Sequence, residues 1–239
     1  MTNTAQLALS VQLPDDEVFD SYLSNANNTV VSQLNIFVKG IEKQGSGQPN
    51  CFYLFGLTGV GKSHLLHASS AYASQLGKTS VCLSCAELLK LSVEVLDGLE
   101  QIDFICLDDI QLVAGNQIWQ QAIFDLYNRV LEHNNRLLVS GNQSVAKLGL
   151  TLPDLHSRLS WGLTEQLKPL SDAEKVMALQ FRALKRGLIL SDEAANFLIN
   201  RLSRTMSNLI TSLDILDKAS IREQRKITIP FIKDVLNIS

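Results

Sequence analysis

The segment from Gly56 to Ser63 has the residue types and the spacing, G-x-x-x-x-G-K-S, of a loop that binds phosphate groups. Its glycines allow the backbone to turn so that N–H groups face phosphate oxygens. The apolar run Cys51–Phe55 before it is typical of a buried strand, and a helix that begins at Lys62 would add the positive end of its dipole. The alternative is a glycine-rich turn that carries Lys-Ser by chance. Such a turn would not need a strand before it and a helix after it, so these flanking elements favour the phosphate loop. The pattern therefore predicts binding of a nucleoside di- or triphosphate.

Two side chains of this loop have expected chemical roles. Lys62 is expected to contact the β- and γ-phosphates, and the Ser63 hydroxyl is expected to hold Mg²⁺. The full set of predicted nucleotide-binding residues is Gly56, Leu57, Thr58, Gly59, Val60, Gly61, Lys62, Ser63 and His64.

Two consecutive carboxylates, Asp108 and Asp109, follow the apolar run 104–107. If that run is a strand of a parallel nucleotide-binding sheet, its carboxyl end lies beside the phosphate loop. Asp108 is then placed to hold Mg²⁺ through water, and Asp109 to orient or activate an attacking water molecule. An Asp-rich turn at a strand end is the alternative, and the presence of the loop favours the magnesium interpretation.

Two further polar residues are candidates for chemistry. Asn142 follows the apolar run 137–140 and could face the γ-phosphate or the water; a simple turn at Ser140-Gly141-Asn142 explains it equally well. Arg158 could stabilise charge on a transferring phosphoryl group, in this chain or on a neighbouring molecule. A solvated surface arginine is the alternative.

Histidine and cysteine spacings do not predict a transition-metal site. Cys82 and Cys85 have C-x-x-C spacing, but no second pair follows at zinc spacing, so we expect no metal or redox role for this pair. His64 and His67 share one helix face without a third ligand, so we interpret them as ordinary helix residues.

Apolar runs that alternate with helical segments must position these residues. Strand-like runs occur at 51–55, 79–84, 103–107, 136–140 and 162–167, and helical periodicity occurs at 86–96 and 117–133. This alternation predicts an α/β fold, in which a parallel sheet is flanked by helices on both faces.

After residue 168 the pattern changes to amphipathic helices alone. Ser171 to Glu174 form a capping box that opens a first helix, and Ser191 can cap a second. Leu209, Leu213 and Leu216 mark a third helix, and Pro230 suits the first turn of a fourth. We predict a small all-helical lid domain over residues 168–239, an α/β nucleotide-binding domain over residues 18–167 and a flexible tail over residues 1–17.

The charge is uneven along the 239 residues. The net charge of −3 divides into −7 over residues 1–167 and +4 over residues 168–239. A dedicated DNA-binding domain would be strongly basic, so we interpret the basic excess as a solvated helical surface. No signal peptide is evident, and the longest uncharged run, 44–61, holds five glycines and a proline, so we expect no membrane span and a cytoplasmic protein.

Four segments together resemble a known family. The phosphate loop, Leu107–Gln111, Ser157–Leu163 and Phe19–Leu23 are similar to the AAA+ module of the bacterial replication initiator DnaA, and the resemblance covers Val18 to Ser239. No helix-turn-helix for duplex DNA follows the lid in this sequence, so the resemblance is with the short regulatory DnaA homologues.

The tail strengthens this resemblance. Gln6-Leu7-Ala8-Leu9 is similar to the Q-L-x-L peptide that docks on the β sliding clamp, where leucines fill apolar pockets and the glutamine amide fixes orientation. The expected clamp-binding residues are therefore Gln6, Leu7 and Leu9.

The resemblance implies a regulatory activity. Short DnaA homologues, bound to the DNA-loaded clamp, make ATP-bound DnaA hydrolyse its nucleotide, which prevents re-initiation of replication. Arg158 then corresponds to an arginine finger offered in trans. Lys62, Ser63 and Asp108 would hold the chain's own ADP or ATP with Mg²⁺. DNA would be reached mostly through the clamp, and self-association stays open.

One position departs from the family pattern. The family places an arginine early in the third lid helix, where it faces the phosphates. Alignment on Leu209 and Leu213 puts Ser207 at this position, with Arg204 nearby. The way in which the lid senses the phosphates is therefore open.

Two other functions fit a phosphate loop. A helicase-loader-like AAA+ ATPase that acts on single-stranded DNA should have a basic groove with aromatic residues, and we find no such cluster. A small-molecule P-loop enzyme would need a substrate-binding insertion or lid arginines, whereas the C-terminal region is a plain helical lid. Clamp binding would favour the regulator, and DNA-stimulated hydrolysis by the isolated protein would favour the loader.

Overall fold

A five-stranded parallel sheet forms the centre of the larger domain. The computed structural model describes residues 17–40, 49–202 and 205–238. The strands are β1 (Cys51–Phe55), β2 (Ser80–Ser84), β3 (Phe104–Asp108), β4 (Arg136–Gly141) and β5 (Leu163–Gln166). Their order is β2-β3-β4-β1-β5, so β1, which leads into the phosphate loop, lies between β4 and β5. All four pairings are parallel, so the five carboxyl ends share one edge.

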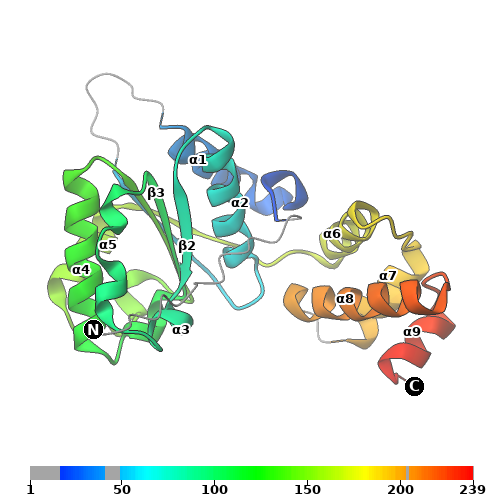
Figure 1. Cartoon of the computed structure of the whole chain (residues 1–239). Helices are drawn as coiled ribbons and strands as arrows, with labels where there is room; N and C mark the ends of the chain where they lie inside the picture. The colour runs from blue at the N-terminus through cyan, green and yellow to red at the C-terminus, as the bar shows by residue number, and fades with distance from the viewer. Residues whose placement is uncertain (1–16, 41–48, 203–204, 239) are drawn as a thin grey trace, which may run out of the picture.

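Helices cover both faces of this sheet, as Figure 1 shows. One face carries α1 (Asn28–Lys39) and α2 (Lys62–Gln75), and the other carries α4 (Gln117–Glu132) and α5 (Pro153–Trp161). Alternate residues of each strand enter opposite apolar clusters: Phe52 and Leu54 pack under α1 and α2, whereas Cys51 and Tyr53 pack under α4 and α5. Strands buried on both faces explain the nearly continuous apolar runs of the sequence.

The segment after β2 differs from its prediction. A single helix over 86–96 was expected, but the chain forms the short helix α3 (Cys85–Leu88) and then a separate 3₁₀ turn (Val93–Leu96). The two pieces are divided at Ser92, whose backbone is extended. Leu88 and Leu96 are both buried in the cluster under α4, so each piece supplies its own core contact.

Four helices form the lid: α6 (Asp172–Lys185), α7 (Asp192–Arg201), α8 (Met206–Glu223) and α9 (Ile229–Leu236). The Ser171 hydroxyl and the Glu174 side chain make the expected capping box at α6, and the Ser191 side chain accepts a hydrogen bond from the Ala194 N–H at α7. Leu209, Leu213 and Leu216 enter the lid core as their spacing predicted. The predicted fold class, a parallel α/β domain followed by a helical lid, is confirmed.

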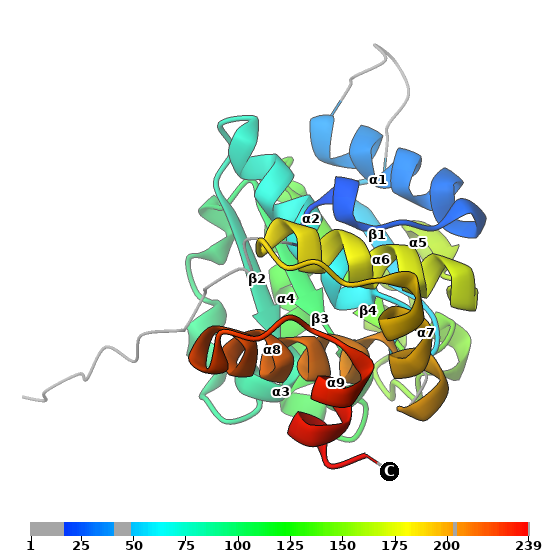
Figure 2. The same cartoon turned by 90° about the vertical axis from the view of Figure 1, so that its right-hand side faces the viewer.

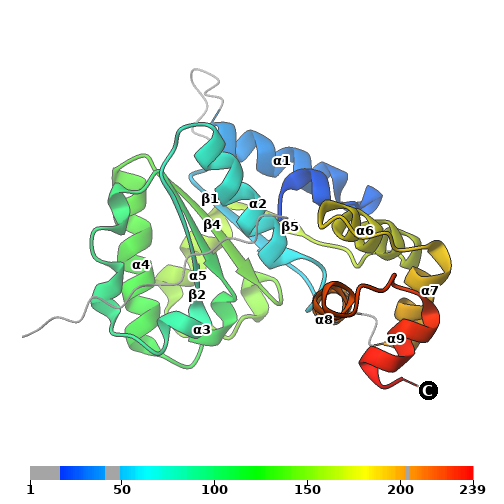
Figure 3. The ribbon, with the colours of Figure 1, turned by 45° about the vertical axis from the view of Figure 1, so that its right-hand side comes forward.

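Polar contacts of α6 and the preceding connection tie the lid to the N-terminal segment of the larger domain. The buried Asn27 side chain donates to the Lys168 carbonyl (2.9 Å) and accepts from the Lys168 N–H (2.8 Å). The Glu174 carboxylate accepts from the Asn25 N–H at 2.7 Å. Figures 2 and 3 show the lid beside the phosphate loop, where a Cβ built on Gly59 would lie 3.2 Å from Thr205. None of the helices in the described residues combines the length and the hydrophobicity that a membrane span requires.

Candidate functional site

A cavity of about 420 Å³ lies where the phosphate loop, the N-terminal segment and the lid meet. The N-terminal segment contributes Glu17 and Ser21 to Leu23, and the lid contributes residues of α6 and α8. Seven of the nine residues predicted to bind nucleotide line this cavity, namely Thr58, Gly59, Val60, Gly61, Lys62, Ser63 and His64. Gly56 and Leu57 do not line it. The segment Phe19–Leu23, singled out by family resemblance, thus reaches the same cavity.

The loop backbone has the shape that its glycines permit. Gly59 and Gly61 have φ angles of +82° and +96°, which side-chain-bearing residues rarely adopt. A Cβ on Gly61 would also lie 2.5 Å from the Tyr22 ring, whose hydroxyl donates to the Val60 carbonyl at 3.0 Å. Tyr22 therefore holds the loop from the side, and glycine is required for this approach.

Lys62 is a buried cation at the wall of this cavity. Its ammonium donates to the carbonyl oxygens of Gly56 (2.9 Å) and Leu57 (3.1 Å). Burial lowers the pKa of Lys62, and the charges of Asp109 and Asp108 oppose this effect. Within the described parts of the chain, no carboxylate forms an ion pair with Lys62. A buried ammonium without a paired anion, next to turned glycines, fits the phosphate groups of a nucleotide.

The two aspartates at the end of β3 have different surroundings. Asp108 is buried and accepts a hydrogen bond from the Ser140 hydroxyl of the neighbouring strand β4. Asp109 has a left-handed backbone (φ +60°), and its N–H donates to the Ser140 Oγ at 2.9 Å. Asp109 lines the cavity together with Gln111, whose side-chain amide donates to the Asp109 carboxylate at 2.9 Å. Asp108 does not line it, and both proposed roles stay predictions.

Asn142 follows β4 and is connected to this acidic pair through Gln111. Its N–H donates to the Gln111 Oε1 atom at 3.1 Å, so Gln111 connects Asn142 to Asp109. Its side-chain oxygen is buried and has no hydrogen-bond partner among the described residues. Asn142 does not line the cavity. The structure thus joins Asp109, Gln111 and Asn142, and sequence reasoning missed Gln111 as their connection.

Arg158 lies elsewhere, on α5. Its guanidinium sits 5.9 Å from the ring centres of both Tyr127 and Trp161, and its carbonyl accepts from the Tyr127 hydroxyl at 3.2 Å. Trp161 is 76% exposed, Arg158 is half-buried and Tyr127 is buried, so this cation–aromatic group lies at the protein surface with one exposed side. Arg158 does not line the cavity that contains Lys62. Its placement suits an action outside the chain's own nucleotide site.

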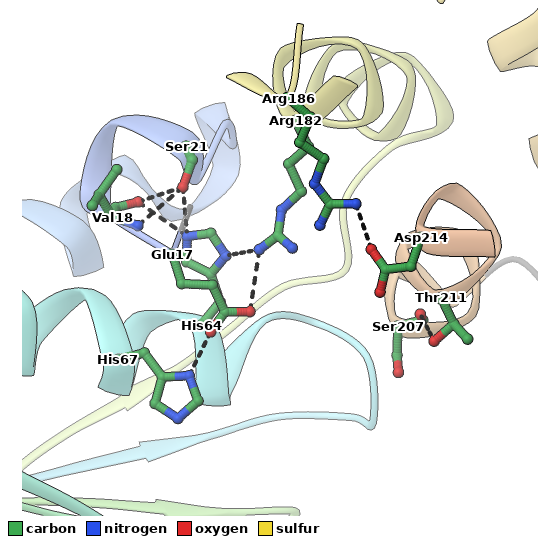
Figure 4. Close-up of polar contacts among 10 residues, drawn as sticks. All are labelled: Glu17, Val18, Ser21, His64, His67, Arg182, Arg186, Ser207, Thr211 and Asp214. Atoms are coloured by element: carbon green, nitrogen blue, oxygen red, sulfur yellow. Dashed lines mark hydrogen bonds and ion pairs between the residues drawn. The ribbon is translucent and has the colours of Figure 1, made fainter. Parts of the chain in front are cut away.

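The structure reveals three charged or ionisable cavity residues whose connection the sequence did not show (Figure 4). Arg182 of α6 is 3% exposed, and its guanidinium contacts the Glu17 carboxylate (3.2 Å) and His64 Nδ1 (2.9 Å). The other His64 nitrogen lies 3.0 Å from the Val18 carbonyl. Because an arginine can only donate, Nδ1 accepts, and the proton of neutral His64 is on Nε2. These contacts join three segments distant in sequence.

Glu17 also contacts α2. Its carboxylate lies 2.5 Å from His67 Nδ1. Burial raises the pKa of Glu17, but the hydrogen bond from His67 and the surrounding positive charges outweigh it and hold the pKa at about 2. Glu17 therefore stays ionised between a lid arginine and a histidine of the larger domain. The sequence did not predict these contacts, because a single acidic residue in a polar segment gives no indication of its tertiary partners.

The lid wall of the cavity includes Ser207, the position where the family places an arginine. Met206, Ile210 and Thr211 lie beside it in the same wall. Among the lid residues that the structure describes, the cation that lines the cavity is Arg182 of α6. Arg204, the nearby arginine noted in the sequence, lies outside the described residues, as do Gln6, Leu7 and Leu9.

The cavity between a P-loop sheet and a helical lid defines an AAA+ module. Residues 13–166 match the bacterial DnaA ATPase domain, and residues 172–236 match the lid domain of Hda. The chain belongs to the DnaA family and is an Hda-like member of it. A DnaA-like ATPase domain is consistent with binding of an adenine nucleotide.

Solved structures share the fold. Domain III of the DnaA initiator from Thermotoga maritima superposes with a TM-score of 0.79 at 17% identity, and the match covers 95% of this chain and 98% of that one. AMPPCP-bound DnaA from Aquifex aeolicus gives 0.67 at 18% identity, covering 85% and 66%. The RuvB Holliday junction branch migration motor of Thermotoga maritima gives 0.67 at 16% identity, covering 94% and 72%.

Replacing Glu17 with Gln should lower the free energy of unfolding by about 3 kcal/mol near neutral pH, because it removes the carboxylate that faces Arg182 and His67. The folded-state pKa of about 2 lies below the ordinary value of 4.5. The contribution of Glu17 is therefore complete above pH 4.5 and is lost as the pH falls toward 2. Urea denaturation of both proteins over this acidic range should give a difference that shrinks with acidification.

The matched control is Glu87→Gln, because Glu87 forms only an exposed pair with Lys90. Its unfolding midpoint should stay that of the wild type. A Glu17→Gln effect that does not change with pH would contradict the assignment to the carboxylate charge.

Proposed function

We propose that this protein is a nucleotide-binding regulator that acts on DnaA. Bound to the DNA-loaded β sliding clamp, it stimulates hydrolysis of the ATP held by DnaA and so prevents re-initiation of replication. The single observation that carries this proposal is the position of Arg158. It is held against two aromatic rings, beside a solvent-exposed tryptophan, and outside the chain's own cavity. The match of the lid to that of Hda supports the same role.

Arg158 would act as an arginine finger in trans. A guanidinium that enters a neighbouring nucleotide site stabilises the charge that develops on the transferring phosphoryl group. Such a group must be accessible yet held in one orientation, because a freely rotating arginine loses entropy on docking. Tyr127 and Trp161 limit its rotation while leaving one side exposed, which supports this role.

The chain's own cavity would hold ADP or ATP with Mg²⁺. Lys62 and the N–H groups of the loop would contact the phosphates, while Ser63 and, through water, Asp108 would hold the metal ion. A bound magnesium ion would neutralise part of the negative charge of the phosphates. Asp109 and Asn142 are candidates for orienting water, and His64 would lie beside the nucleotide through its contacts with Val18 and Arg182. The bound nucleotide would serve mainly as a conformational ligand between the larger domain and the lid.

The clamp would be contacted by the tail. Gln6, Leu7 and Leu9 supply an amide and two apolar side chains in the order of a clamp-binding peptide. Glu17 follows these residues in the chain, pairs with the lid residue Arg182 and lines the nucleotide cavity, so a tail bound to the clamp would be linked to the rest of the chain at this cavity.

Replacing Lys62 with Ala should weaken binding of a fluorescent ADP by about 10- to 100-fold, because a charge-assisted contact to phosphate is lost. The thermal unfolding midpoint without nucleotide should change little, since the Lys62 ammonium bonds to two carbonyl groups and to nothing else in the described parts of the chain. Lys90→Ala, at an exposed surface lysine, is the matched control and should bind like the wild type. Equal affinity of Lys62→Ala and wild type would exclude this cavity as the phosphate site.

Replacing Arg158 with Ala should reduce stimulated hydrolysis of DnaA-bound ATP by about a thousandfold, or to the unstimulated rate, while ADP and clamp binding stay unchanged. Arg201→Ala is the matched control, because Arg201 also lies 5.9 Å from an aromatic ring, that of Phe197 in the lid. Phosphate release with labelled ATP preloaded on DnaA measures the effect. A collapsed melting temperature of the Arg158 variant would instead assign it a structural role.

Replacing Gln6 and Leu7 with Ala should abolish retention of the protein on immobilised clamp, because two of the three anchor groups of the peptide are removed. Asn3→Ala in the same tail is the control and should leave retention unchanged. Clamp binding that survives the double substitution would rule out the tail as the docking element.

The complete reaction tests the whole proposal. Hydrolysis of DnaA-bound ATP is measured with this protein, DNA-loaded clamp and Mg²⁺, and each component is omitted in turn. A requirement for every component supports the clamp-dependent regulator. Hydrolysis by this protein alone, stimulated by single-stranded DNA and indifferent to the clamp, would point to a loader-like ATPase. Hydrolysis or phosphoryl transfer that needs only a small molecule would point to a P-loop enzyme.

A further inference from the structure

The first lid helix, α6, has apolar residues on two different faces. Leu179 and Ala183 enter the lid core, whereas Met177, Phe181 and Leu184 belong to none of the three apolar clusters. Their spacing of four and three residues places these three side chains on one helix face, here named the α6 stripe. Met177 is 46% exposed, Leu184 is 68% exposed and Phe181 is half-buried. A surface helix needs one apolar face for its own core, so a second, exposed one indicates a docking surface.

The N-terminal segment runs along α6 in the opposite direction. The Asn25 N–H donates to the Glu174 carboxylate at 2.7 Å near the start of the helix. Eight residues earlier in the chain, the Glu17 carboxylate contacts the Arg182 guanidinium at 3.2 Å near the end of the helix, as Figure 4 shows. Figure 2 shows the same segment beside α6. The residues before Glu17 are therefore connected to the molecule at a point one residue away from Phe181 of the stripe.

The chain before Glu17 is long enough to cover the stripe. Residues 1–16 lie outside the described part of the chain, and an extended chain spans roughly 3.3 Å per residue. Leu13 and Val11 lie four and six residues before Glu17, so they can reach about 13 and 20 Å from it. The stripe from Met177 to Leu184 is about 10 Å long at 1.5 Å per helical residue. Both apolar side chains can therefore contact it while Glu17 keeps its place.

The composition of these residues is complementary to the stripe and its edge. Apolar residues alternate with small or polar ones, at Leu7, Leu9, Val11 and Leu13. An extended chain presents all four on one side. Two acidic residues, Asp15 and Asp16, follow them. Lys185 is exposed at the edge of the stripe, with its ammonium 5.3 Å from the centre of the Phe181 ring. The stripe thus offers an apolar face and a positive charge to a segment with an apolar side and a negative end.

We propose that the α6 stripe is a docking surface for residues 7–13 of the chain's own N-terminal tail. The apolar side of the extended tail packs on Met177, Phe181 and Leu184, and the acidic pair after it faces Lys185. Because Leu7 and Leu9 are also expected to bind the clamp, the stripe and the clamp compete for the same segment. The competition rests on the proposed function, whereas the docking itself rests only on α6 and the tail.

Photochemical cross-linking of the full-length protein tests the docking. The photoreactive amino acid benzoylphenylalanine takes the place of Val11, and mass spectrometry identifies the cross-linked peptides. We expect one dominant intramolecular cross-link, to residues 176–185. Leu184→Glu should lower its yield about tenfold, because a carboxylate in the stripe would lose its water on docking. Ile221→Glu is the matched control, because Ile221 is 71% exposed on α8 outside the stripe, and it should leave the yield unchanged.

A second stripe variant guards against a loss of folding. Thermal unfolding is recorded for Leu184→Glu, and Met177→Glu repeats the measurement at the other end of the stripe, also at an exposed position. Cross-links spread over the whole chain, or a yield that neither stripe variant lowers, would overturn the proposal. A cross-link between two copies, seen as a dimer that disappears on dilution, would assign the stripe to self-association and overturn it as well.

Affinity for immobilised clamp tests the competition separately. Leu184→Glu should bind the clamp about threefold more tightly than the wild type, because docking leaves only a fraction of the tails free to bind. Ile221→Glu should bind like the wild type. Equal affinity of Leu184→Glu and the wild type would show that the stripe does not compete with the clamp. Absence of clamp binding in every protein would contradict the proposed function, while the cross-link still decides the docking.

Discussion

The parallel direction of five strands is the constraint on which the rest of this structure depends. Parallel strands in register bring all their carboxyl ends to one edge, and each must be followed by a crossover that passes over a face of the sheet. The phosphate loop after β1 and Asp108 at the end of β3 therefore meet at this edge, although more than forty residues separate them. Burial of both faces fixes the register, since a shift by one residue would exchange the apolar clusters under α2 and α4.

A second level of organisation comes from the N-terminal segment. Asn27 holds the start of the lid through two backbone hydrogen bonds, Tyr22 supports the phosphate loop, and Glu17 faces Arg182. Asn27 and Tyr22 are buried and Glu17 is half-buried, so each of these polar groups would be costly without its partner. The segment between the tail and α1 consequently acts as the joint between the larger domain and the lid. A nucleotide in the cavity would touch the three parts that this joint connects.

Most of the fold was predictable from the sequence because it depends on local and periodic signals. Apolar runs marked the strands, and the capping box at Ser171 and the serine at 191 marked the starts of α6 and α7 within one residue. The helix expected over 86–96 was wrong, because helical spacing of apolar residues does not reveal an extended residue such as Ser92 between two short pieces. The residues of the phosphate loop could be predicted as a group, because one sequence motif contains all of them. Gln111 and Arg182 were not, since their partners come from other elements and only tertiary structure joins them.

The nucleotide cavity and the surroundings of Arg158 also differ in whether one domain or several segments build them. The residues that face the chain's own cavity come from the N-terminal segment, the loop and the lid, so their arrangement changes if the lid moves. Arg158 is held by Tyr127 and Trp161 of α4 and α5, which belong to one domain and share one apolar cluster. Its orientation is therefore independent of the lid contacts made by Glu17 and Asn27. A movement of the lid would therefore leave the contacts that hold Arg158 unchanged. Under the proposed function, the chain's own nucleotide would act through the lid, while the proposed arginine finger would stay preorganised.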